Sequence, residues 1–129
     1  AVYNHYKRIQ AGEASRAEVR QWTCNDLAVQ DWYLQPVGDG YYQIGNGHSG
    51  LCLDNKDWAT AAGSVVQQWT CNGLAVQQWR VTSVGGGYST LVNRHSGLCL
   101  DNYNFGTAPG AEVRQWTCNG NNAQQWSTA

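Results

Sequence analysis

Hydrophobic residues along this chain occur in short segments, each bounded by glycine, asparagine or another turn-forming residue. Examples are Tyr41 to Ile44, Leu51 to Leu53, Val65 to Thr70 and Gln78 to Val81. Segments of this length between turn residues are typical of β-strands. No apolar stripe of helical period continues over roughly ten or more residues. The pattern therefore predicts an all-β protein.

The chain contains three copies of one unit. The string QWTCN occurs three times, and its tryptophans, separated by a constant 47 residues, are Trp22, Trp69 and Trp116. A second tryptophan follows ten residues later in each copy, at Trp32, Trp79 and Trp126. The string HSGLCLDN begins at His48 and again at His95. A fixed period of this kind indicates a repeat architecture, with units at about residues 1–39, 40–86 and 87–129.

Each unit holds about four short strands, too few to bury an apolar face alone. We therefore expect the three units to close around a shared core in a single domain, residues 1–129. The joints between units are predicted in the glycine-rich stretches Gly38 to Gly40 and Gly85 to Gly87.

Composition excludes several functions. Charged residues make up 13% of the chain and the net charge is -1, so nucleic acid is not an expected partner. No apolar run approaches the roughly 20 residues that span a bilayer, so membrane insertion is not expected. Five cysteines and no methionine favour a secreted, extracellular protein. The N-terminus has no signal-peptide pattern, which predicts the mature form of such a protein.

The CLD, QxWxC and QxW segments, repeated in this order, resemble the ricin B-type lectin family, also called family 13 carbohydrate-binding modules. The resemblance covers nearly the whole chain. It implies a β-trefoil with pseudo-threefold symmetry, in which six strands form a short barrel and six more cap one end. It also implies binding of galactose-type or xylose-type sugars at up to three surface pockets.

The family resemblance also implies one disulfide per unit, Cys52 with Cys71 and Cys99 with Cys118. Zinc is the rival interpretation of clustered cysteines, but no CxxC or HxxxH spacing accompanies them. No metal or cofactor is expected. Cys24 lacks a partner, which leaves a buried free thiol or an intermolecular disulfide as alternatives, and the protein is expected to be a monomer or a weak dimer.

The first unit departs from the other two. Aligning Ile9 with Leu53 places Arg8 and Gln10 at the cysteine and aspartate positions, whereas an ungapped alignment places His5 and Lys7 there. Neither alignment restores Cys or Asp. We therefore predict that this unit binds sugar weakly or not at all, although it retains Trp22.

A sugar presents an apolar face and a rim of hydroxyls, so its site needs a flat aromatic ring and fixed polar groups. In the second unit, Asp54 is the predicted acceptor, Trp69 the platform, and Gln77 the donor that holds Asp54. Asp101, Trp116 and Gln124 occupy the same places in the third unit. Gln67 and Arg114, two residues before the platforms, are further candidate donors. From the residues alone, the platform tryptophans could equally be core, and each aspartate could form an Asx turn.

The residue before the QxW segment is often Asn in galactose-binding members of the family, but here it is Val76 or Ala123. The missing polar partner is sought in Asn55 and Asn102, or in Asn72 and Asn119. Trp58 and Phe105 are candidates for a second aromatic wall. The change opens the sugar preference to deoxy sugars such as rhamnose.

The repeats supply no catalytic pair. Glycoside cleavage needs two carboxylates, and Asp57 of the second unit is matched by Asn104 in the third. No GxSxG string occurs. We expect a lectin, not an enzyme, that binds mono- or oligosaccharides on cell-surface glycans or polysaccharides and cross-links them. The alternatives are a carbohydrate-binding module of a secreted glycoside hydrolase acting on xylan or galactan, and a protein-interaction scaffold.

Overall fold

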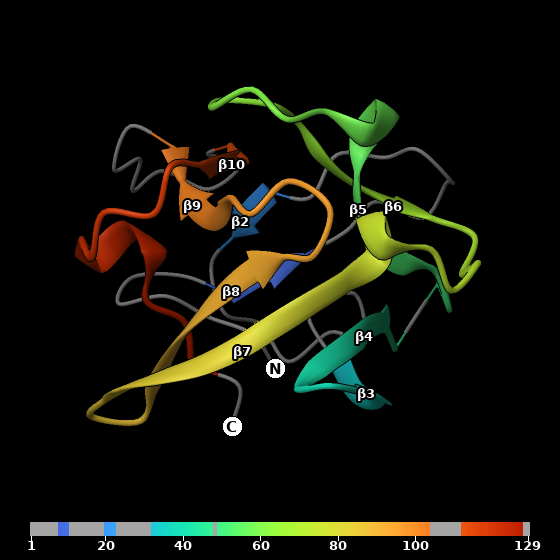
Figure 1. The fold of residues 1–129 in the computed structure, drawn as a ribbon, viewed down its shortest axis with the longest axis horizontal. Helices are drawn as coiled ribbons and strands as arrows, with labels where there is room; N and C mark the ends of the chain where they lie inside the picture. Colours follow the sequence, from blue (N-terminus) through green and yellow to red (C-terminus); the bar gives the residue numbers. More distant parts are fainter. Residues whose placement is uncertain (1–7, 11–19, 23–31, 48, 104–111, 128–129) are drawn as a thin grey trace.

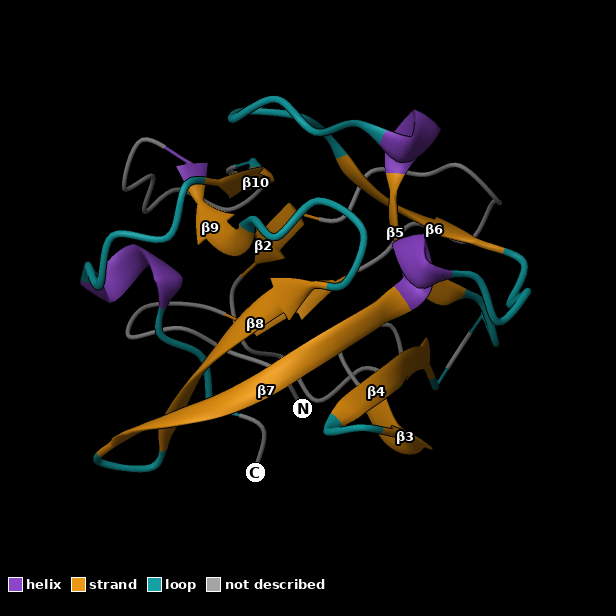
Figure 2. Cartoon of the chain, in the orientation of Figure 1, coloured by secondary structure: helices purple, strands orange, loops and turns teal. Residues whose placement is uncertain are grey.

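The computed structural model describes residues 8–10, 20–22, 32–47, 49–103 and 112–127, and the structural statements below concern these residues. They contain no α-helix, and the segments coloured as helix in Figure 2 are short 3-10 turns. Those that lie wholly within the described residues are η2 (Lys56–Trp58), η3 (Ala75–Gln77) and η5 (Asn122–Gln124). The strands are β1 (Arg8–Gln10), β2 (Arg20–Trp22), β3 (Trp32–Gly38), β4 (Tyr41–Asn46), β5 (Cys52–Asn55), β6 (Val66–Trp69), β7 (Gln78–Gly85), β8 (Tyr88–Asn93), β9 (Cys99–Asn102) and β10 (Val113–Trp116).

The strands repeat the same arrangement along the chain (Figure 1). β3 pairs with β4 and β5 with β6, and the next four strands pair in the same way as β7 with β8 and β9 with β10. β4 also pairs with β7, which joins the first and last strands of the second repeat, and the β7–β8 pair continues the sheet into the third. This is the arrangement of a β-trefoil, and the predicted all-β class is confirmed.

The glycine-rich stretches lie at hairpin turns. Residues 38–40 connect β3 to β4, and residues 85–87 connect β7 to β8, with a register irregularity beside each turn. Gly85, Gly86 and Gly87 have φ values of 91°, 64° and 82°, a region that glycine enters without strain. The predicted joints between units therefore fall inside hairpins. β7 consequently extends to Gly85, beyond the apolar segment that ends at Val81.

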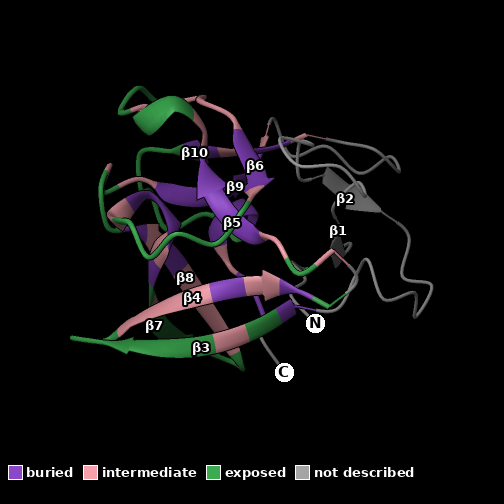
Figure 3. Cartoon of the chain, turned by 90° about the vertical axis from the view of Figure 1, so that its right-hand side faces the viewer, coloured by how far each residue is buried: buried purple, intermediate pink, exposed green. Residues whose placement is uncertain are grey.

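The core is built from equivalent positions of the repeats (Figure 3). The tryptophans of the QxW segments are buried, and the indole Nε1 of Trp79 donates to the carbonyl oxygen of Leu53 at 3.1 Å. Trp126 repeats this bond to Leu100 at 2.9 Å. The cluster consists of Trp32, Ile44, Leu53, Val66, Trp79, Leu91, Leu100, Val113 and Trp126.

Two disulfides join Cys52 to Cys71 and Cys99 to Cys118, which confirms the pairing implied by the family. Each ties the strand that carries an aspartate to the loop after the platform tryptophan. Cys24 lies outside the described residues.

The first repeat contributes the β1–β2 pair, whose register decides between the two alignments. Arg8 faces Trp22 and Gln10 faces Arg20. In the second repeat Cys52 faces Trp69 and Asp54 faces Gln67. Gln10 therefore stands at the aspartate position, and the ungapped alternative with Lys7 is wrong.

We predict that replacing Cys52 and Cys71 together by alanine lowers the free energy of unfolding by about 3 kcal/mol, because the unfolded chain regains the entropy of a loop of about 20 residues. Urea unfolding monitored by tryptophan fluorescence measures this change. The disulfide between Cys99 and Cys118 closes a loop of the same length. Replacing both of these cysteines by alanine should therefore lower the free energy of unfolding by a similar amount. An unchanged unfolding midpoint in both double variants would contradict the prediction.

Candidate sugar-binding sites

A surface pocket with a volume of about 430 Å³ lies in the second repeat, at the end of β5. Four predicted site residues line it: Asp54, Asn55, Gln67 and Trp69. Two further candidates from the sequence, Trp58 and Asn72, also line it, together with Lys56, Asp57 and Val76. The pocket therefore combines two carboxylates, several other polar groups and two tryptophan rings.

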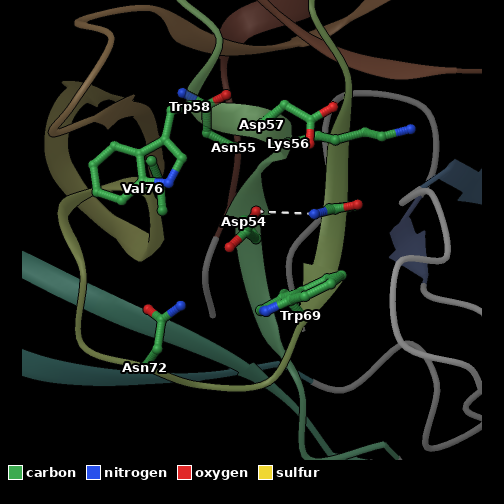
Figure 4. Close-up of a pocket in the computed structure, with 9 residues that line it drawn as sticks. Asp54, Asn55, Lys56, Asp57, Trp58, Trp69, Asn72 and Val76 are labelled. Carbon is green, nitrogen blue, oxygen red and sulfur yellow. Dashed lines mark hydrogen bonds between the residues drawn. The ribbon is translucent and has the colours of Figure 1, made fainter.

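The carboxylate of Asp54 is held from two sides. Gln67 Nε2 donates to its Oδ1 at 3.1 Å, the dashed line in Figure 4, and Gln77 Nε2 donates to its Oδ2 at 3.0 Å. Gln77 is fully buried, and its amide also donates to the carbonyl oxygen of Thr70 and accepts from the main-chain nitrogen of Asn72. The predicted bond from Gln77 to Asp54 is thus present. Because the side-chain amide of Gln77 is itself held by three hydrogen bonds, it fixes the direction of the carboxylate.

Burial raises the pKa of the Asp54 carboxyl above its ordinary value of 3.8. The hydrogen bonds from Gln77 and Gln67 act in the opposite direction, and the neighbouring charge of Asp57 adds to the increase. The pKa of Asp101 is raised by burial in the same way, against the hydrogen bond from Gln124. Ionised carboxylates at these positions are therefore desolvated acceptors, which gain more from a ligand hydroxyl than an exposed carboxylate would.

Two aromatic rings flank Asp54. Trp58 and Trp69 lie on opposite sides of it in Figure 4. Trp69 is partly buried, and Trp58 is 48% exposed. Neither belongs to the core cluster. Both rings are thus accessible for stacking.

Asn55 and Asn72 differ in how their side chains are used. Asn55 is fully buried and donates to the carbonyl oxygen of Ala59 at 2.8 Å, while Gln115 of the third repeat donates to its Oδ1. Asn72 accepts from the main-chain nitrogen of Leu74 at 3.0 Å and lines the pocket. Of the two candidates for the missing polar partner, Asn72 presents its side chain better.

The third repeat reproduces the acceptor but not its whole setting. Gln124 Nε2 donates to Asp101 Oδ2 at 2.9 Å. Arg114 faces Asp101 in the strand register, yet its guanidinium pairs with Glu112 at 2.9 Å. Trp116 is 38% exposed, and Asn102 is fully buried. Phe105 lies outside the described residues.

A glycine of the second repeat lies against the platform of the third. A Cβ added to Gly63 would approach Trp116 Cζ3 at 3.2 Å. The main-chain nitrogen of Gly63 also donates to the carbonyl oxygen of Gln115 at 2.7 Å. The loop before β6 therefore sets how far the ring of Trp116 can turn toward the second repeat.

Within the described part of the chain, no group of three or more His, Cys, Asp or Glu side chains could hold a metal ion. None of the helices found there is long and apolar enough to cross a membrane.

Residues 7–126 of this chain match the protein family described as the Ricin-type beta-trefoil lectin domain. The chain belongs to this family. Membership supports carbohydrate binding as the function of the domain. No curated protein matches the chain.

Solved structures similar to this ricin-type domain share its fold. The designed threefold-symmetric protein ThreeFoil has 36% sequence identity and a TM-score of 0.92, over 98% of this chain and 96% of that one. The exo-beta-1,3-galactanase 1,3Gal43A from Clostridium thermocellum has 35% identity and a TM-score of 0.94, but the chain spans only 28% of the enzyme. The Polyporus squamosus lectin has 20% identity and a TM-score of 0.84, over 98% of this chain and 46% of the lectin, which establishes the shared fold alone.

Sequence reasoning missed two residues that line the pocket of this ricin-type domain, Lys56 and Asp57. They follow Asn55 in η2, where the third repeat has Tyr103 and Asn104. Asp57 has a φ of 57°, so the chain turns sharply there. No periodic signal marks these positions, because the repeats diverge directly after the LDN string.

We predict that Gly63→Ala destabilises the protein by about 1 kcal/mol or more, because its φ of +88° strains any side chain, and that it also weakens the third repeat's site. Gly73→Ala is the matched control, since its φ is +71° and nothing lies within 4 Å of its added Cβ. Both variants should unfold at lower urea concentration. Only Gly63→Ala should change sugar binding, and equal binding by the two variants would contradict a role for the Trp116 contact.

We predict that Asp54→Asn removes a pH dependence of stability. A pKa raised in the folded state means that the folded protein binds the proton more tightly, so stability falls as pH rises from about 3.8 through the raised pKa. The amide introduced by Asp54→Asn can be accommodated. The buried Oε1 of Gln67 has no hydrogen-bond partner among the described residues, so a flipped Gln67 side chain can accept a bond from the new amide with this oxygen. Urea midpoints measured from pH 3 to pH 7 should decline less in the variant. A wild-type midpoint that rises through this window relative to the variant would contradict the assignment.

Proposed function

We propose that this domain is a lectin without catalytic activity, which binds one sugar at Asp54 in the second repeat and one at Asp101 in the third. The observation that carries the proposal is the Asp54 carboxylate, fixed by two amide donors between two accessible tryptophan rings. This arrangement supplies a directed acceptor for sugar hydroxyls and flat surfaces for the C–H face of the ring.

The preferred ligands are galactose-like sugars and deoxy sugars such as rhamnose. A sugar whose apolar face stacks on Trp69 places its hydroxyls toward Asp54, with Asn72 as a further polar contact. Val76 and Trp58 also line the pocket and supply it with an apolar wall. A methyl group at this wall would be favoured, because burying it removes apolar area from water without leaving a hydroxyl unpaired.

The proposal excludes glycoside cleavage as the activity of this domain. Asp54 and Asp57 both line the pocket, and a raised pKa is expected of a general acid. However, Gln67 and Gln77 donate to both oxygens of Asp54, which suits an acceptor and not a proton donor. Asp57 is also replaced by Asn104 in the third repeat, so the pair is not a property of both sites.

The alternative function is that of a carbohydrate-binding module within a larger secreted glycoside hydrolase. Its support is the 35% identity to the exo-beta-1,3-galactanase, of which this chain spans 28%. In that case the ligand is a polysaccharide such as galactan. Retention on insoluble galactan or xylan favours the module, whereas agglutination of cells by the isolated chain favours a free lectin. Secretion, in either case, is supported by the two disulfides.

Two sites on one chain allow cross-linking. Individual sugar contacts on an open surface are weak, because hydroxyls exchange bonds to water for bonds to protein. Simultaneous engagement of two sites raises the apparent affinity by a factor on the order of 100 or more where the geometry allows it. The first repeat is not expected to add a third site of equal strength, because an amide at Gln10 accepts less strongly than a carboxylate.

We predict that Asp54→Ala and Asp101→Ala each remove one of two binding sites in calorimetric titrations with methyl β-galactoside and methyl α-rhamnoside. Each single variant should keep its remaining site but fail to agglutinate glycan-bearing cells. Asp39→Ala, which changes a carboxylate 82% exposed on a hairpin turn, is the control and should agglutinate normally.

Unchanged titrations of the Asp54→Ala, Asp101→Ala double variant would overturn the proposed sites. Agglutination that persists in a single variant under oxidising conditions and disappears on reduction would point to a dimer joined through Cys24. Agglutination that also persists under reducing conditions would contradict the two-site account.

A further inference from the structure

One wall of the second repeat's pocket is supported by the third repeat. Trp58 follows Asp57 in η2, and both have positive φ values, 56° and 57°, although neither is glycine. Such a conformation is costly for a bulky residue and persists only where surrounding contacts hold it. The contacts of Trp58 therefore decide whether its ring keeps the position seen at the pocket.

His95, which begins the second HSGLCLDN string, makes two of these contacts. Its Nε2 lies 3.2 Å from the carbonyl oxygen of Trp58. Since a carbonyl oxygen only accepts, Nε2 is the donor. The two rings also meet edge to face, with centroids 4.9 Å apart and planes at 85°. This geometry is favourable for aromatic pairs.

The position of His95 is itself fixed by a buried residue. Asn93 Oδ1 accepts from the main-chain nitrogens of His95 and Ser96, each at 3.1 Å. Asn93 Nδ2 donates to the carbonyl oxygen of Val76 at 3.0 Å. Through Asn93, the turn that carries His95 is thus bonded to η3, the 3-10 turn that supplies Val76 to the pocket.

We propose that His95 is a positioning residue for the second repeat's sugar site, which it completes from the neighbouring repeat by holding the ring of Trp58. His95 does not line the pocket itself, so it acts through Trp58. This inference rests on the proposed sugar binding at Asp54. It extends that proposal, because the site in the second repeat then depends on His95, a residue of the third repeat.

The decisive experiment compares His95→Ala in two single-site backgrounds. In Asp101→Ala, only the second site remains, and the variant should bind methyl β-galactoside or methyl α-rhamnoside about five- to tenfold more weakly, as expected for a lost aromatic contact and hydrogen bond. In Asp54→Ala, only the third site remains, and His95→Ala should leave its affinity unchanged. His95→Phe retains the ring contact and should recover part of the binding.

His48→Ala is the matched control, because His48 begins the other copy of the same string. It should leave the second site's affinity unchanged. Equal losses at both sites on His95→Ala would show a general structural role and overturn the proposal. So would full binding by His95→Ala at the second site.

A measurement without ligand separates this inference from the proposed function. With 5-fluorotryptophan incorporated, the ¹⁹F resonance of Trp58, assigned by its loss in Trp58→Phe, should shift in His95→Ala while that of Trp69 stays in place. An unmoved Trp58 resonance would overturn the positioning role. If the Trp58 resonance shifts but the protein binds neither sugar, the contact between His95 and Trp58 is supported. The proposed function, and with it the role of His95 in binding, would then be overturned.

Discussion

The structure depends on one short string, QxW, which anchors the core and the site to the same strand. The indole of Trp79 donates to the carbonyl oxygen of Leu53, and the amide of Gln77 donates to the carboxylate of Asp54, the next residue along β5. The third repeat has the same two bonds from Gln124 and Trp126 to β9. Because both members of the string are fully buried, the packing that closes the trefoil also sets the direction of the carboxylate.

This coupling explains why the site is rich in buried amides. Gln77 donates a hydrogen bond to one carboxylate oxygen of Asp54 from the buried side. The carboxylate can therefore accept hydrogen bonds from a ligand with its remaining lone pairs. The consequence is a desolvated charge, seen in the raised pKa values of Asp54 and Asp101. Functional sites often depart from the optimum for stability in this way, and the disulfides beside each site offset the destabilisation.

Threefold repetition makes the sites similar, but the seams between repeats make them unequal. Asn55 of the second repeat is bonded to Gln115 of the third, and Gly63 of the second lies against the platform Trp116. At the same seam, His95 of the third repeat contacts Trp58 of the second. Each site is therefore completed by the repeat beside it, and substitutions in one repeat are expected to change binding in another.

The sequence by itself determined the all-β class, the repeat, the disulfide pairing once the family was recognised, and the bond from Gln77 to Asp54. Those contacts lie within one repeat, so they recur at constant spacing and leave a periodic signal. Tertiary structure alone decided that Gln10 occupies the first repeat's aspartate position, that the amide of Asn55 is used between repeats, and that His95 reaches Trp58. These contacts join residues of different repeats or depend on strand register. The sequence separation of the paired residues shows no periodic pattern, because the packing of three short units around a shared core determines which residues meet.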